Sequence, residues 1–80
     1  MLTGVQIRAA RSALGMSAER LAALSGIATK TIRRIESEDG IPHSTASTLA
    51  KIQTALEAAG IQFVGSPDDA PGIRIHLRPA

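Results

Sequence analysis

The spacing of apolar residues changes at Gly60, and this change constrains the fold more than any other feature of the sequence. Before Gly60, apolar residues recur roughly every three or four positions, as they do along a helix with one buried face. After it, they recur at every second position in residues 61–64 and 73–77. The sequence therefore predicts a mainly α-helical unit over residues 1–60 and a short β extension over residues 61–80.

Capping residues and glycines divide the first unit into four short helices. Thr3, Ser17 and Thr45 are of the types that cap helix N-termini, and glycines commonly follow helix C-termini. The predicted helices run from near Thr3 to Gly15, from Ser17 to Ser25-Gly26, from about Thr29 to Glu36, and from Ser44 or Thr45 to Gly60. Leu24 belongs to the apolar positions of the second helix, and the expected core residues are Leu21, Ile27, Ile32, Ile35, Leu49, Ile52 and Leu56.

The β extension is predicted to form two strands, residues 61–64 and 73–77, joined by a loop over residues 65–72 that is rich in Gly, Pro and Asp. Each strand has one apolar face. An isolated hairpin is only marginally stable in water. We therefore expect the strands either to cover the helices or to pair with another subunit, which makes residues 61–80 a candidate dimerisation element.

Composition excludes several classes of protein. The chain has 80 residues and no cysteine, so disulfides and thiolate zinc sites are ruled out. A single Phe, with no Trp or Tyr, disfavours a platform that stacks the bases of RNA or single-stranded DNA. No apolar run approaches the roughly 20 residues of a membrane span, and no secretory pattern is evident, so we expect a cytoplasmic location.

Charge is distributed unevenly along the chain. Six of the nine Lys and Arg residues lie in residues 1–35 together with one acid, whereas six of the seven acids lie in residues 36–80. A basic segment balanced by an acidic one indicates that one face of the protein meets an anion, and nucleic acid is the usual anion.

The most informative motif lies in residues 18–36, which read as a short helix, a glycine turn and a second short helix. Ala22 is small where the two helices would cross, and Gly26 permits the positive φ angle that such a turn needs. With Ile32 and Ile35 facing inward, the outward stripe is Lys30, Arg33, Arg34 and Ser37. A basic stripe on a short anchored helix suits the major groove of DNA, where Arg and Lys bond guanine O6 and N7.

The same residues resemble the Xre-type regulators related to lambda repressor and Cro. The resemblance is carried by Gly15-Met16-Ser17-Ala18-Glu19-Arg20-Leu21-Ala22, Ser25-Gly26-Ile27 and Thr31-Ile32-Arg33-Arg34-Ile35-Glu36, and it extends over about residues 3–78. It implies a lambda-repressor-like four-helix helix-turn-helix domain with a short C-terminal β hairpin. It also implies sequence-specific binding of double-stranded DNA by a transcriptional regulator acting as a repressor in the bacterial nucleoid.

The resemblance assigns roles to individual residues. Base-facing positions on the third helix are Thr29, Lys30, Arg33 and Arg34, and phosphate-contacting positions are Ser17, Ala18 and Thr31. Arg11 and Glu36 correspond to an ion pair that joins the first helix to the end of the third. His43, near the start of the fourth helix, is a further candidate for a phosphate contact, with a simple turn histidine as the alternative. We interpret Arg8 and Arg20 as solvated side chains, with a phosphate contact as the alternative for each.

Three positions depart from the family pattern. Ala18 stands where the family usually has Gln, which removes a side-chain contact but leaves backbone N–H groups for a phosphate. Ala28 stands where a Ser often caps the third helix, so Thr29 is the alternative cap. Glu38-Asp39 follows the third helix where repressors are commonly basic, and it lowers the affinity that we expect for DNA.

One domain of this kind reads only a few base pairs. We therefore expect a homodimer on a pseudo-palindromic operator with half-sites about 10 bp apart. Two alternatives remain open. The chain could be the antitoxin of a toxin–antitoxin operon, with its C-terminal strands binding the toxin. It could also be an interaction module that keeps the fold without binding DNA.

Catalysis and metal binding are not expected from these residues. His43 and His76 make no recognisable zinc pattern, and Asp68-Asp69 is typical of a solvated turn. The neighbouring Ser44 and His43 lack an acid that would orient them as a catalytic pair. We therefore expect neither an enzyme nor a protein that needs a cofactor or a metal.

Overall fold

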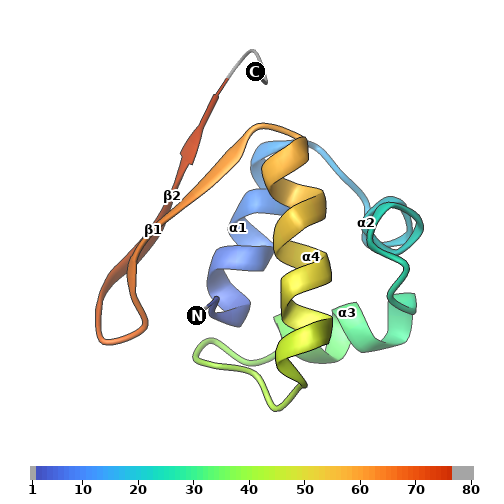
Figure 1. Cartoon of the computed structure of the whole chain (residues 1–80), viewed down its shortest axis with the longest axis horizontal. Coiled ribbons are helices and arrows are strands. Elements are labelled where there is room, and N and C mark those ends of the chain that lie inside the picture. Colours follow the sequence, from blue (N-terminus) through green and yellow to red (C-terminus); the bar gives the residue numbers. More distant parts are fainter. Residues whose placement is uncertain (1, 77–80) are drawn as a thin grey trace.

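Residues 2–76, the part of the chain that the computed structural model describes, form four helices followed by a two-stranded antiparallel sheet (Figure 1). The elements are α1 (Gly4–Ala13), α2 (Ala18–Ser25), α3 (Thr29–Glu36), α4 (Ala46–Ala58), β1 (Ile61–Ser66) and β2 (Asp69–Ile75). In Figure 1 the hairpin lies beside α1, and α2 lies on the opposite side of the molecule. The predicted mainly α fold with a C-terminal hairpin is confirmed.

Side-chain caps begin three of the four helices. Thr3 forms a capping box with Gln6, in which each side chain bonds the backbone N–H of the other. Ser17 accepts a hydrogen bond from the N–H of Arg20, and Thr45 caps α4 in the same way. These N-caps are the ones that the sequence predicted.

The third helix begins differently. Its N-cap is Ala28, which has no side-chain oxygen to offer, and Thr29 is already the first helical residue. The expectation that Thr29 would replace the missing cap is therefore wrong. Because the preceding Ala28 already takes the extended conformation of a cap residue, with φ −61° and ψ 141°, Thr29 enters the helix with its hydroxyl free of that task.

A single apolar core holds the helices together. Its largest fully buried members come from every helix, and they are Ile7, Leu21, Ile32, Ile35, Ile52 and Leu56. Ile27 is half-buried and packs against this core. Leu24 is one of the apolar positions predicted for α2, but its side chain is 46% exposed, because α2 and α4 do not close over it. Leu24 instead lines an open groove beside α4.

Close backbone approach requires a glycine at the start of α1. The N–H of Gly4 donates to the carbonyl of Gly40, 2.9 Å away. A Cβ atom at Gly4 would lie 1.7 Å from the carbonyl oxygen of Glu38, a distance that backbone atoms cannot tolerate. The missing side chain therefore lets α1 lie directly against the segment that follows α3.

The strands of the hairpin are longer than the sequence predicted. β1 continues to Ser66 and β2 begins at Asp69, so the expected loop over residues 65–72 shrinks to a tight turn. The prediction failed because Gly65 does not end the strand: it sits at φ 76° where the register shifts, a bulge in β1. Leu77, expected in the second strand, lies outside the described residues.

The hairpin covers the helices, which was one of the two arrangements expected. Ile61 is buried, and Phe63 and Ile73 pack against the helical core. β2 lies against α1, and β1 lies against α4. Gln6 secures the contact, because its Nε2 donates to the carbonyls of Val64 and Gly72, at 3.2 and 2.9 Å. One side chain therefore links the cap of α1 to both strands.

Replacing Gln6 with Ala should destabilise the fold by about 1–3 kcal/mol, because two part-buried carbonyls lose their donor and the capping box loses one arm. Urea unfolding followed by circular dichroism measures the change. The matched control is Gln53→Ala on α4, whose amide reaches only Glu57. This control should change stability by no more than about 0.5 kcal/mol. Equal effects of the two variants would contradict the linking role of Gln6.

Candidate nucleic-acid interface

The predicted helix-turn-helix motif corresponds to α2, α3 and the turn between them. Gly26 adopts the left-handed conformation, with φ 74°, and its N–H closes α2 on the carbonyl of Ala22 at 2.9 Å. A residue with a Cβ atom would be strained there. Ile32 and Ile35 anchor the inner side of α3 in the core, with no exposed area. The turn and the two isoleucines together determine which side of α3 faces solvent.

The outward side of α3 carries a basic stripe, which we define as Lys30, Arg33 and Arg34. All three side chains are exposed, and Ser37 extends the same side at the end of the helix. Thr29 and Thr31, the other candidates on this helix, are half-buried. The predicted base-facing residues thus lie on one helix. The two threonines are less exposed to solvent than the three basic side chains.

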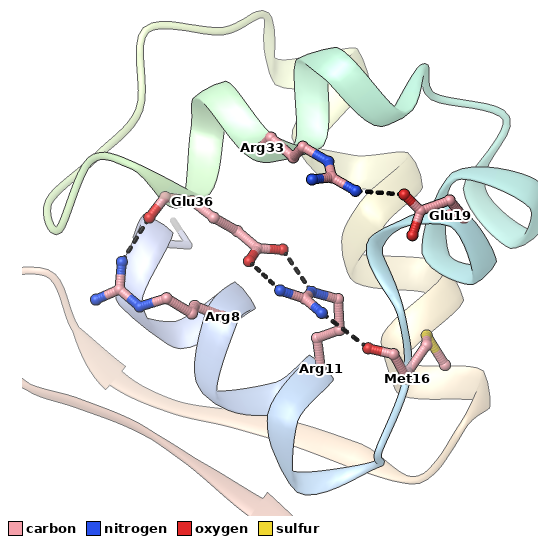
Figure 2. A network of polar contacts seen from close by, with 6 residues as sticks. All are labelled: Arg8, Arg11, Met16, Glu19, Arg33 and Glu36. Carbon is pink, nitrogen blue, oxygen red and sulfur yellow. Dashed lines mark hydrogen bonds and ion pairs between the residues drawn. The ribbon is translucent and has the colours of Figure 1, made fainter.

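Two side chains of the basic stripe already have partners within the protein. Arg33 forms an ion pair with Glu19 of α2, which Figure 2 shows bridging the two helices. Arg34 donates from Nη1 to the carbonyl oxygen of His43, 2.8 Å away in the segment before α4. Sequence reasoning missed both contacts, because neither spacing along the chain is that of neighbours on one helix.

The candidate phosphate contacts lie at the N-terminus of α2 and on α3. The hydroxyl of Ser17 accepts from the N–H of Arg20 at 3.0 Å, so this side chain acts first as a cap. Ala18, the first residue of α2, is only 6% exposed and packs into the core. Thr31, the third of these candidates, belongs to α3 and is half-buried.

His43, the remaining phosphate candidate, is bonded to an acid. Its Nδ1 lies 3.0 Å from Oε1 of Glu38, and its backbone N–H donates to the other carboxylate oxygen at 2.9 Å. These hydrogen bonds from His43 hold the pKa of Glu38 below its ordinary value. The negative charge of Glu38 therefore sits directly beside the imidazole, which is otherwise open to solvent.

The pair expected from the resemblance, Arg11 and Glu36, joins α1 to the end of α3 (Figure 2). Both carboxylate oxygens are engaged: Nε of Arg11 donates to Oε2 at 2.9 Å, and Nη2 donates to Oε1 at 2.8 Å. The remaining nitrogen, Nη1, donates to the carbonyl of Met16 at 2.9 Å. Glu36 is only 7% exposed, and its hydrogen bond raises the pKa of Arg11. The bidentate contact therefore gives both oxygens of the largely buried Glu36 carboxylate a charged hydrogen-bond donor.

Arg8 reinforces the same junction, although the sequence had suggested a solvated side chain. Its Nη1 donates to the backbone carbonyl of Glu36, as Figure 2 shows. Its Nη2 forms an ion pair with Asp39 at 2.9 Å. Arg8 is therefore partly exposed, as predicted, but it is also bound to the protein, because α1 runs close enough to the last turn of α3 for a long side chain to reach it.

Residues 2–76 hold no group of three or more His, Asp or Glu side chains that could bind a metal ion. Within the same range, no helix combines the length and the apolar character needed to cross a membrane.

A family model described as helix-turn-helix matches residues 7–59, which is more than half of the chain. The match begins within α1, includes all of α2 and α3, and ends at Ala59, the C-cap of α4. The hairpin lies outside it. No curated protein matches the chain at a significant level.

Changing Glu36 to Gln should destabilise the fold by about 3 kcal/mol, because Arg11 keeps a largely buried charge without its carboxylate partner. Urea denaturation at neutral pH measures the loss. The matched control is Asp39→Asn, which breaks an exposed ion pair with Arg8 and should leave the midpoint nearly unchanged. If the two variants were equally stable, the junction between α1 and α3 would not depend on the buried pair.

Proposed function

The chain belongs to the Xre or lambda-repressor-like helix-turn-helix family of DNA-binding regulators, and we propose that it represses transcription by binding one specific double-stranded sequence. The observation that carries the proposal is the basic stripe on α3, whose three cations face solvent while the opposite side of the helix is anchored in the core. A rigid helix with one exposed basic side has the shape and charge that the major groove accepts.

In this proposal α3 enters the major groove and α2 lies across its outer edge. Lys30, Arg33 and Arg34 contact base edges, since Arg and Lys pair well with guanine O6 and N7. Thr29, free of any capping task, contacts bases at the start of the helix. The N-terminus of α2 faces a backbone phosphate, which backbone N–H groups and the helix dipole favour. Ser17, Ala18, Thr31 and His43 are the proposed phosphate contacts.

We propose further that the protein acts as a homodimer on a pseudo-palindromic site. A single α3 spans only a few base pairs, so two copies with half-sites about 10 bp apart are needed for a selective operator. The hairpin supports this arrangement, because β1 and β2 each present one unpaired edge and Ile75 is 50% exposed at the end of β2. The second copy would pair along the hairpin and shelter Ile75.

Selection of bound duplexes from a random library, followed by sequencing, should yield a two-fold symmetric motif with half-sites about 10 bp apart. On that motif, Arg33→Ala and Arg34→Ala should each cost about 1–3 kcal/mol of binding free energy and relax base preference at one position. Fluorescence anisotropy with the selected duplex measures the affinity of each variant.

The matched control for these variants is Lys51→Ala, which removes an exposed cation from α4, away from the basic stripe. It should bind the selected duplex as the unmodified protein does. If no duplex were enriched, the proposed function would be wrong. Copurification of a stoichiometric protein partner would then favour the antitoxin alternative.

Replacing Ile75 with Lys should shift the protein from dimer to monomer, because a charge would enter the apolar contact between two hairpins. Sedimentation velocity at micromolar concentration measures the state. Arg74→Ala is the neighbouring control, since it shortens an exposed side chain of the same strand and leaves Ile75 in place. A dimer that survived Ile75→Lys unchanged would place the subunit interface elsewhere.

A further inference from the structure

The ion pair between Glu19 and Arg33 joins the two helices of the DNA-binding motif (Figure 2). The carboxylate projects from the first turn of α2 and reaches the guanidinium that projects from α3. Both side chains are well exposed, at 61% and 63% respectively, so the pair lies on the surface. Of the four ion pairs in residues 2–76, this is the one that holds a member of the basic stripe.

The position of Glu19 on α2 keeps it ionised. It is the second residue of the helix, where the positive end of the helix dipole favours an acid. A hydrogen bond from its own backbone N–H, followed by the one from Arg33, holds the pKa of Glu19 below its ordinary value. A full negative charge is therefore present at neutral pH beside Arg33 and at the α2 N-terminus.

The carboxylate of Glu19 therefore occupies the region in which the proposed function places DNA. A phosphate would lie at the N-terminus of α2, and a base acceptor would lie at the guanidinium of Arg33. In the free protein the carboxylate of Glu19 binds that guanidinium instead. The bond to Glu19 uses Nη2 of Arg33, and a bidentate contact to guanine O6 and N7 needs that nitrogen to turn toward the base.

We propose that Glu19 is an internal competitor for Arg33, and that DNA binding requires the carboxylate to release the guanidinium. The inference rests on the proposed function and adds a residue that limits affinity. Release costs the interaction energy of the pair, and it occurs whichever duplex is bound. Glu19 therefore weakens binding to all duplexes, so that only a sequence offering Arg33 a good acceptor compensates the loss.

The test measures binding of a mixed-sequence 20 bp duplex by four proteins at low salt: the unmodified chain, Glu19→Gln, Arg33→Ala and the double variant. Gln keeps the size of Glu and removes its charge. Glu19→Gln should bind roughly two- to fivefold more tightly, as expected when an exposed ion pair no longer has to be broken. In the Arg33→Ala background the same change should give a clearly smaller gain, because it then relieves only the repulsion between the carboxylate and the DNA phosphates.

A second control separates competition from net charge. Glu57→Gln removes an exposed acid from the far end of α4, where its carboxylate contacts only Gln53. It should leave the affinity unchanged. An equal gain from Glu19→Gln with and without Arg33 would mean simple repulsion of phosphates and would overturn the inference.

Two further results would also count against it. Weaker binding by Glu19→Gln would mean that the carboxylate orients Arg33 for DNA, which is the opposite role. Absence of duplex binding by the unmodified chain and by all variants would overturn the proposed function and the inference together. That result is distinct from a failure of the inference alone, in which the protein binds DNA and Glu19→Gln has no effect.

Discussion

The orientation of α3 depends on the ion pair between Arg11 and Glu36. An isolated helix of eight residues is not stable in water, so α3 exists only through its contacts. Ile32 and Ile35 supply the apolar part of these contacts, but two buried side chains less than one turn apart do not by themselves fix the end of the helix. The bidentate guanidinium of Arg11 fixes the far end, because both oxygens of Glu36 must be satisfied at once. The direction of the basic stripe follows from that geometry.

Folding brings the two oppositely charged parts of the sequence together. Asp39 and Glu36, from the acidic part, bond Arg8 and Arg11, from the basic part. Part of the uneven charge along the chain is therefore neutralised at the junction of α1 with the end of α3. The basic stripe stays exposed on α3, so the charge that this helix offers to solvent is more local than the sequence count suggests.

Local chemistry made much of the fold predictable. Thr3, Ser17 and Thr45 cap helices through atoms a few residues away, so their role can be inferred from the sequence alone. The failures concern contacts across the chain: Leu24 is exposed because of how α2 and α4 meet, and the contact between Arg8 and α3 depends on how α1 lies. For the candidate site, helical spacing located the basic stripe but could not show which acids its members contact.

The contacts of Gln6 have a consequence for the order in which the protein can be built. Its partner carbonyls lie 58 and 66 positions further along the chain. A ribosome releases Gln6 well before those carbonyls, so the first helices emerge before the hairpin can form. The Arg11–Glu36 pair needs only residues up to Glu36, so it can form in that interval. The hairpin then packs against α1 and α4 and completes the hydrogen bonds of Gln6. A chain whose translation stopped before the hairpin would lack these contacts.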